Sequence, residues 1–542
     1  MYPPYMRELI KKVDETRPKR KGIEFDRMTP KQREDVLRNF HPDYVEESFE
    51  EIPLGKNKGD RAPRELVKLL KKPSRIDVSN INLDEPDYNV DVLIIGGGGA
   101  GAAAALSARS EGASVLLATK LRLGDCNTMM AQGGIQAATL PHDSPSIHYL
   151  DAMGGGHFTN LPELVYTLVH DGPGIIKWLE DLGVNFDKKE DGTLKPNHGG
   201  GTSRKRMHAA RDYTGADIMR VLRDEVYNKE ISVFEFCPAM DIILDDKGSA
   251  SGAVLYDVET NRYVVVKAKT VILASGGSGR LHFQGFPTTN HYGATGDALV
   301  MAYRAGAGLK YMDTIQYHPT GAAFPPQILG QLVTEKLRGM GATPVNIEGE
   351  LFVHHLEPRD VEAAAIIREC SEKGKGIKTP TGLDGVWLDT PLLEAIHGEG
   401  TLLNNFPAMV RQFGRFEIDM RKEPILIYPT LHYQNGGIEI DEKCETNVGN
   451  LFAAGENSGG VHGRNRLAGN SLLDVMVFGR RAGLNAAGKL EDIEEVKSEK
   501  LTLEHLDNHK KELQQVGIDA ILEENEDSPL LFPDYLSKAE NS

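Results

Sequence analysis

An apolar run that ends in a cluster of glycines constrains this chain more than any other feature of its sequence. The run Asp91-Val-Leu-Ile-Ile95 is followed by Gly96-Gly-Gly-Gly-Ala-Gly101 and then by the alanine-rich segment 102–109. The order of strand, glycine turn and helix is typical of a dinucleotide-binding site. Its glycines allow a tight turn, a close approach of the backbone to a pyrophosphate, and close packing of the helix on the strand. In that order they are Gly96, Gly98 and Gly101.

The bulk composition narrows the class of protein. The chain has 542 residues, of which 40% are hydrophobic, so it can bury a large core, and its length suggests two or three domains. Its formal net charge of −17 argues against nucleic acid as the main ligand. No apolar stretch reaches the length of about 18 residues that a membrane span needs, and residues 1–7 lack the apolar core of an export signal. We expect a globular protein that associates with a membrane only peripherally, through partners.

The four cysteines show neither a metal-binding nor a disulfide pattern. They are scattered along the chain without a C-x-x-C pair, at Cys126, Cys237, Cys370 and Cys444. The sequence therefore predicts no disulfide framework and no metal site of the iron–sulfur or zinc kind. A reducing, cytoplasmic compartment fits this usage best. Any metal cluster that supplies electrons is expected on another chain.

Strand and helix patterns alternate through the middle of the chain, which predicts an α/β fold. A strand over 113–118 follows the first helix and completes a βαβ start. The apolar segments 270–277 and 450–456 end in small residues, which lets a cofactor approach the carboxyl ends of strands. Both are expected in the sheet of the same nucleotide-binding domain, although a long segment separates them. We therefore expect an inserted domain over 313–427.

The two ends of the chain differ from its middle. Residues 1–87 predict an N-terminal extension with proline breaks and short helices over 30–39 and 63–72. This extension either packs on its own chain or docks a partner. Acidic residues predominate over 491–542, where we expect a short tail with a polar helix over 501–515.

The end of the second strand bears on which nucleotide is bound. A dinucleotide site for NAD normally has an acidic residue there, which binds ribose hydroxyls. The corresponding segment reads Ala118-Thr119-Lys120, without a carboxylate, which argues against a simple NAD dehydrogenase. Glu456, at the end of a late strand, offers a carboxylate for a ribose or ribitol hydroxyl instead.

A series of motifs follows the glycine turn in a fixed order. They are Ala131-Gln-Gly-Gly134, Ala209-Ala-Arg-Asp-Tyr-Thr-Gly215, Thr295-Gly-Asp297, Gln316-Tyr-His-Pro-Thr-Gly321, Thr334-Glu-Lys-Leu-Arg-Gly339, Pro358-Arg-Asp360, Leu431-His-Tyr-Gln-Asn-Gly-Gly437 and Gly463-Arg-Asn-Arg-Leu-Ala-Gly-Asn-Ser-Leu472. With this series the chain resembles, from about residue 88 to 490, the flavoprotein subunit of fumarate reductase and succinate dehydrogenase. The same group contains L-aspartate oxidase.

The resemblance implies a Rossmann-like FAD-binding domain with an inserted α+β capping domain. The FAD-binding domain would comprise 88–312 and 428–490, and the capping domain 313–427. The resemblance further implies that the cofactor is FAD, held by Gly96, Gly98, Gly101, Thr119, Lys120, Asn127, Thr128, Gly133, Gly134, Asp297, Glu456, Ser471 and Leu472.

Four residues match the substrate-binding positions of the family: His318, Thr334, His432 and Arg466. A small dicarboxylate needs cationic or hydrogen-bonding groups at both ends. The guanidinium of Arg466 has the planar fork that suits a carboxylate, and the histidines can donate through their ring N–H groups. Each residue taken singly has an ordinary structural explanation, such as a buried core histidine or a surface ion pair. The set as a whole favours substrate binding.

Arg359 matches the residue with which the family protonates the substrate carbon opposite the hydride. A guanidinium is a poor acid, with a pKa above about 12, so it has to be reprotonated quickly. Glu335 and Arg338, three residues apart, would lie on one helical face and form that proton relay. The resemblance thus implies fumarate reduction by hydride transfer from flavin N5, with Arg359 as the proton donor and electrons from an iron–sulfur partner subunit.

Two positions depart from patterns within the family. Membrane succinate dehydrogenases and many fumarate reductases link a histidine covalently to the flavin, and Asn127 stands at that place here. We therefore expect noncovalent FAD.

L-aspartate oxidase has a glutamate that recognises the substrate's amino group, where this chain has Gly199. L-aspartate oxidase is the first alternative, and a non-catalytic FAD-binding electron-transfer subunit is the second. The sequence leaves open whether the electron donor is a quinol, a thiol or a reduced carrier.

Overall fold

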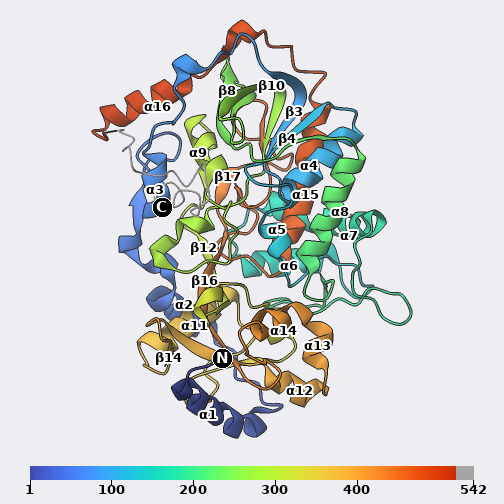
Figure 1. Ribbon diagram of the computed structural model, residues 1–542, viewed down its shortest axis with the longest axis vertical. Helices are drawn as coiled ribbons and strands as arrows, with labels where there is room; N and C mark the ends of the chain where they lie inside the picture. The colour runs from blue at the N-terminus through green and yellow to red at the C-terminus, as the bar shows by residue number, and fades with distance from the viewer. Residues whose placement is uncertain (520–542) are drawn as a thin grey trace.

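A computed structural model of the chain describes residues 1–519, which form two lobes stacked along the longest axis of the molecule (Figure 1). The upper lobe in this view contains an eight-stranded sheet, and the lower lobe contains a five-stranded sheet. Each lobe has its own large hydrophobic core. Among the helices of these 519 residues, none carries a stretch long and apolar enough to cross a membrane.

The centre of the larger sheet is the βαβ unit that the glycine motif predicts. Strand β3 (Tyr88–Ile95) is followed by α4 (Gly99–Ser110) and β4 (Val115–Ala118), and the two strands pair in parallel. Strand β10 (Arg262–Leu273) pairs in parallel with the other edge of β3, and β18 (Leu451–Ala453) pairs in parallel with β10. The two distant apolar segments therefore lie in one sheet, as predicted.

Antiparallel strands extend this sheet on the far side of β10. They are β9 (Ala250–Asp257), β8 (Ala239–Asp245) and β20 (Leu501–Thr502), while β7 (Ser232–Phe234) pairs in parallel with β4 at the opposite edge. The helix expected over 501–515 is wrong at its start, because Leu501 and Thr502 pair with β8. Helix α16 is Glu504–Gln515. The rest of the expected acidic tail, 520–542, lies outside the described residues.

Four helices stand together beside the parallel strands, on the right of Figure 1. They are α4, α7 (Pro162–Leu182), α8 (Thr214–Asn228) and α15 (Asn470–Gly488). Helices α4 and α15 approach closely because two glycines of α15 leave room for the backbone of α4. A Cβ on Gly479 would lie 2.7 Å from the carbonyl oxygen of Ala100, and one on Gly483 would collide with that of Ala104. This packing fixes the helix that begins at the glycine turn.

The five-stranded sheet of the second lobe is antiparallel throughout. Its strands are β12 (Ile315–Ala322), β16 (Ile425–Gln434), β15 (Asp384–Asp389), β13 (Thr343–Val345) and β14 (Ile377–Lys378). Helix α11 (Arg359–Ser371) packs on β12, β15 and β16, and α12 (Pro391–His397), α13 (Thr401–Asn405) and α14 (Pro407–Gly414) lie farther out. The lobe is formed by chain that runs between β10 and β18, where the sequence predicts an insertion.

The N-terminal extension runs along both lobes. Helix α1 (Pro4–Arg20) packs its apolar residues into the core of the second lobe, and α2 (Pro30–Phe40) packs on α11. After the short hairpin of β1 (Phe49–Glu51) and β2 (Arg61–Pro63), α3 (Arg64–Leu70) packs into the core of the first lobe. The extension thus packs on its own chain, one of the two alternatives that the sequence leaves open.

The other α-helices and strands are short. They are α5 (Asn127–Met130), α6 (Pro145–Gly155), α9 (Asp297–Arg304), α10 (Lys336–Gly339), β5 (Ile135–Gln136), β6 (Met207–His208), β11 (Leu309–Lys310), β17 (Gly437–Glu439) and β19 (Ser458–Gly459).

Candidate active site

Two adjoining cavities lie between the glycine turn and the second lobe, each with about 870 Å³ of empty space. The first is lined by the glycine turn, the end of β4 and the start of α9. The second is lined by residues of β12, α15 and the segment around Thr334. The cavities share Asn127, Thr128, Glu456 and Val475. A long ligand can therefore run from the first cavity into the second.

The glycine turn forms a cradle in which two glycines, Gly96 and Gly101, have no room for a side chain. Gly96 has a φ of +125°, and a Cβ on it would collide with Ala274. A Cβ on Gly101 would collide with the carbonyl oxygen of Gly96, so Gly101 serves the close packing behind the cavity. Helix α4 has Gly98 at its N-cap, so the N-cap residue itself offers no side chain to the first N–H groups of the helix. This cradle fits a pyrophosphate, because it combines close backbone approach with a helix N-terminus.

A buried lysine and carboxylate lie beside this cradle. Lys120 Nζ is 2.8 Å from Oδ2 of Asp297 and donates to Thr295 Oγ1 at 2.6 Å. Burial raises the pKa of Asp297, and the ammonium of Lys120 opposes that rise. Thr119, Lys120 and Asp297, which the sequence analysis assigns to the cofactor, all line the first cavity.

Asn127 lies where the two cavities meet, and protein groups hold its amide from both sides. Its Nδ2 donates to Asn290 at 2.6 Å and to Glu456 at 3.1 Å, and its Oδ1 accepts from the backbone N–H of His291 at 2.7 Å. Glu456 also accepts the backbone N–H of Gln434 at 3.2 Å. The amide is thereby fixed in place. The sequence analysis gives no role to Asn290, because only the fold brings it to Asn127.

The other residues expected at the cofactor line the second cavity: Thr128, Gly133, Gly134, Ser471 and Leu472. Gly134 has a φ of +126°, and a Cβ on it would lie 2.6 Å from the carbonyl oxygen of His208. The hydroxyl of Ser471 accepts a hydrogen bond from Arg466 at 2.9 Å. The structure thus brings the expected cofactor residues next to the expected substrate residues.

Two histidines, the buried His318 and the partly buried His432, meet edge-on in the second cavity. The rings of His318 and His432 have centroids 4.9 Å apart. Burial, together with the charge of Arg359, holds the pKa of His318 well below its ordinary value, and burial does the same for His432. Nδ1 of His318 accepts the backbone N–H of Thr320 at 3.2 Å. A neutral His318 therefore carries its proton on Nε2, where it can serve as a donor.

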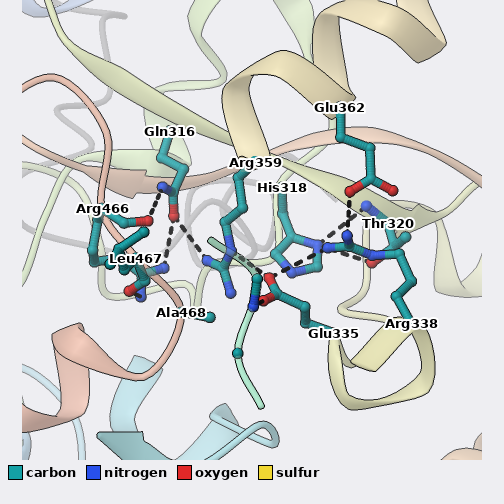
Figure 2. Close-up of polar contacts among 12 residues, drawn as sticks. Gln316, His318, Thr320, Glu335, Arg338, Arg359, Glu362, Arg466, Leu467 and Ala468 are labelled. Carbon is teal, nitrogen blue, oxygen red and sulfur yellow. Dashed lines mark hydrogen bonds and ion pairs between the residues drawn. The ribbon is translucent and has the colours of Figure 1, made fainter. Parts of the chain in front are cut away.

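Gln316 joins the two arginines expected at the substrate, as Figure 2 shows. Its Oε1 accepts from Arg359 at 2.8 Å and from Arg466 at 2.8 Å, and its Nε2 donates to the backbone of Arg466 at 2.7 Å. The sequence analysis does not assign a role to Gln316. A signal is present in the sequence, because Gln316 and His318 are two residues apart on a strand and so share one face.

Arg359 continues into a chain of buried charges (Figure 2). Its Nε is 2.6 Å from Oε2 of Glu335, and the same oxygen is 3.3 Å from Nη2 of Arg338. Arg338 is fully buried behind Glu335, and its other nitrogen contacts Glu362. Burial raises the pKa of Glu335, but the charges of Arg359 and Arg338 outweigh it and bring the pKa to about 2. The expected pairing of Glu335 with Arg338 is therefore present.

The second cavity has an excess of positive charge. Burial and the nearby Arg359 lower the pKa of Arg466 to about 9, which leaves it a cation at neutral pH. Arg359 and Arg466 both line the cavity, and so do two carboxyls: Glu335, which is ionised, and Glu456, whose pKa is raised by burial. Arg338 adds a third guanidinium directly behind Glu335. Such a site stabilises a small anion, because the charges act in a buried, low-dielectric setting.

Comparisons with known proteins agree with this geometry. A family model described as an FAD binding domain matches residues 91–472. The first subunit of the fumarate reductase (CoM/CoB) of Methanothermobacter marburgensis is 40% identical over 411 residues, which cover 74% of this chain and 73% of that protein. This chain belongs to the fumarate reductase and succinate dehydrogenase flavoprotein family.

The similar proteins include both L-aspartate oxidases and fumarate reductases. The L-aspartate oxidase of Clostridium acetobutylicum is 36% identical over 422 residues, covering 77% of this chain and 92% of that protein. A solved structure of a variant of E. coli quinol fumarate reductase matches with a TM-score of 0.71 at 32% identity, covering 80% of this chain and 74% of that one. The predicted α/β fold, FAD as cofactor and membership in an oxidoreductase family are confirmed.

Proposed function

We propose that this chain is the catalytic flavoprotein of a fumarate reductase, which interconverts fumarate and succinate at their CH–CH group. The observation that carries the proposal is the buried pair Arg359 and Arg466, joined by Gln316, in a cavity that adjoins the FAD cradle. A dianion without an amino group matches this excess of positive charge.

Seven residues in or directly behind the second cavity divide the tasks of this reaction. Arg466, His318, His432 and Thr334 bind and orient the two carboxylates of the substrate. Arg359 delivers the proton to the substrate carbon, and Glu335 and Arg338 return a proton to it. FAD held in the first cavity, once reduced by the electron donor, would supply the hydride. Fumarate thereby gains one hydride and one proton, and succinate is released.

We also propose that the FAD is noncovalent. Asn127 stands where other members of the family carry the linking histidine, and an amide nitrogen does not form that bond. Its amide is already committed to Asn290, Glu456 and the backbone of His291. Acid precipitation should therefore release the whole of the yellow cofactor into the supernatant, and flavin retained by the pellet would show a covalent bond.

The electrons are proposed to come from an iron–sulfur partner subunit. Among residues 1–519 no group of three or more His, Cys, Asp or Glu side chains could hold a metal ion. The relative from Methanothermobacter marburgensis is named as one subunit of its fumarate reductase, which supports a partner chain. The same name includes CoM/CoB, which supports a thiol among the donors that the sequence leaves open.

The cysteine usage supports a cytoplasmic location, with any membrane association made through partners.

L-aspartate oxidase is the competing function, since members of that group are also relatives. An ammonium group needs a carboxylate, and Gly199 stands where that enzyme has its glutamate. Two carboxyls line the cavity, and both already have partners. Glu335 is held by Arg359, Arg338 and the backbone N–H of Gly200 at 2.7 Å. Glu456 accepts from Asn127 at 3.1 Å and from the backbone N–H of Gln434 at 3.2 Å.

A steady-state assay of the purified chain with FAD decides between the functions. Reduced viologen as artificial donor should be oxidised when fumarate is added, and L-aspartate with oxygen should give no oxaloacetate. Turnover of L-aspartate without fumarate reduction would establish the oxidase. Bound FAD with neither activity would establish the non-catalytic electron-transfer role.

A further inference from the structure

Glu362 is a buried carboxylate that the reaction described above does not use. It lies one turn after Arg359 on α11, and its side chain has no solvent-exposed surface. One of its oxygens contacts Nη1 of Arg338, and the other, Oε1, has no hydrogen-bond partner (Figure 2). The contacts therefore form a continuous row from Arg359 through Glu335 and Arg338 to Glu362.

The two carboxylates that share Arg338 differ in their surroundings. Glu335 has a second arginine, Arg359, and a backbone N–H from Gly200. Glu362 has Arg338 alone, and an ionised carboxylate with one unpaired buried oxygen is costly. Burial raises the pKa of Glu362 to about 8, against the opposing charge of Arg338. At neutral pH Glu335 is ionised, whereas Glu362 holds a proton.

Other charged groups face Glu362 from the neighbouring segments. The charges of Glu335 and Glu357 add to the rise in its pKa. Glu357 pairs with Arg33 of α2 at 2.8 Å, and the Arg33 side chain is 32% exposed. His355, whose carbonyl oxygen accepts from Arg338 at 3.0 Å, has its pKa lowered by burial to about 4 and is neutral. The cluster around Glu362 therefore reaches solvent at Arg33, which belongs to the N-terminal extension.

We propose that Glu362 is a proton-holding positioning residue that extends the relay behind Arg359 by one group, acting through Arg338. The inference rests on the proposed reduction of fumarate. When Arg359 has given its proton to the substrate carbon, Glu335 passes it a proton taken from Arg338. Arg338 then recovers its proton from the carboxylic acid of Glu362, which is refilled from solvent. One proton leaves solvent for each proton that reaches the substrate carbon, so the series of proton transfers balances.

The variant Glu362→Gln tests this inference, because glutamine has the same shape and holds no transferable proton. Wild-type fumarate reduction should fall as pH rises through about 8, where Glu362 loses its proton. In E362Q the rate should drop roughly tenfold or more, the limb near pH 8 should vanish, and KM for fumarate should be unchanged. E362D should restore part of the rate and the alkaline limb.

Glu369→Gln is the matched control, since Glu369 is buried on the same helix and pairs with Lys373 at 2.8 Å outside the relay. E369Q should keep the wild-type rate and pH profile. An E362Q enzyme with the wild-type rate would overturn the proposal. A uniform loss of rate that leaves the alkaline limb in place would also overturn it, because it would assign Glu362 a structural role only.

An infrared measurement separates this inference from the proposed function. The wild-type protein with bound FAD should show the carbonyl stretch of a protonated carboxylic acid at pH 7, which disappears near pH 8 and is missing in E362Q. Absence of that band in the wild type would overturn the proposal even where fumarate is reduced. A protein that shows the band without reducing fumarate would retain the proton on Glu362 and refute the fumarate reductase assignment instead.

Discussion

At the scale of single residues, the geometry of the candidate active site depends on the neutral side chain of Gln316, which lies between the guanidiniums of Arg359 and Arg466. Oε1 of Gln316 is the shared acceptor for Arg359 and Arg466 at 2.8 Å each. Two buried guanidiniums would otherwise repel each other without a common partner. An amide holds them at fixed positions without cancelling their charge, and that charge is what a dianionic substrate needs. The geometry of Gln316 therefore bears on both substrate affinity and proton delivery.

The substitution Gln316→Glu should separate these two contributions. It keeps the accepting oxygen but adds a negative charge between the arginines, so the cavity attracts a dicarboxylate less strongly. We expect KM for fumarate to rise by at least about tenfold, which corresponds to roughly 1.4 kcal/mol of binding free energy. Steady-state kinetics with FAD content measured for each preparation would check this. An unchanged KM would show that the charge of the arginines does not drive binding.

At the scale of elements, the N-terminal extension is part of the second lobe rather than an appendage. Arg17 and Arg20 of α1 both pair with Asp389 of β15 at 2.8 Å, and the Asp389 side chain has no exposed surface. Tyr2 meets the ring of Trp387 edge-on, with centroids 5.4 Å apart. A buried carboxylate between two arginines holds α1 against the sheet. Removing both partners would leave a buried charge unpaired.

The double substitution Arg17→Ala with Arg20→Ala should therefore destabilise the second lobe by about 3–5 kcal/mol. Chemical denaturation followed by tryptophan fluorescence would measure it. The chain has 2 tryptophans, so a Trp178→Phe background leaves Trp387 as the reporter for this lobe. The control is Lys11→Ala on the same helix, which breaks an exposed pair with Glu8 and should leave the midpoint unchanged. A double variant as stable as the control would show that α1 is not held by Asp389.

At this scale, the sequence predicts well those helices and strands whose formation depends on residues close together in the chain. The strand, glycine turn and helix from Tyr88 to Ser110 follow from apolar runs and glycines that act within a few residues. Helix α1 was not predicted, because its stability comes from packing on a lobe more than 300 positions along the chain. Leu501 and Thr502 are expected in a helix from the local sequence pattern. The structure places them in a strand, because they pair with β8, which is distant in the sequence.

The site shows the same division between local pattern and long-range contact. Seven residues are singled out by the resemblance for substrate binding and proton transfer. Six of them line one cavity, namely His318, Thr334, Glu335, Arg359, His432 and Arg466, while Arg338 lies behind Glu335. The resemblance gives no role to Gln316 or Glu362. A glutamate in a charged helical segment is usually solvated, so only the three-residue spacing from Arg359 could have pointed to Glu362. That it shares Arg338 with Glu335 depends on how α10 meets α11, which the sequence alone does not encode.

At the scale of the whole molecule, the reaction needs both lobes. The first lobe provides the glycine cradle, and the second provides β12 and α11, which carry His318 and Arg359. Figure 1 shows β12 and α11 below the larger sheet. The N-terminal extension packs on both lobes and covers the outer side of the buried charges through α2. The proposed cofactor site, the proposed substrate cavity and the row of buried charges therefore adjoin one another between the two lobes.

The most direct test of this account is the rate of fumarate reduction by Arg359→Ala compared with the wild type, with reduced viologen as donor and at equal FAD content. Arg359 lines the substrate cavity and begins the row of buried charges, so its removal should lower kcat by about a hundredfold or more while FAD stays bound. An R359A enzyme that reduces fumarate at the wild-type rate would contradict the account.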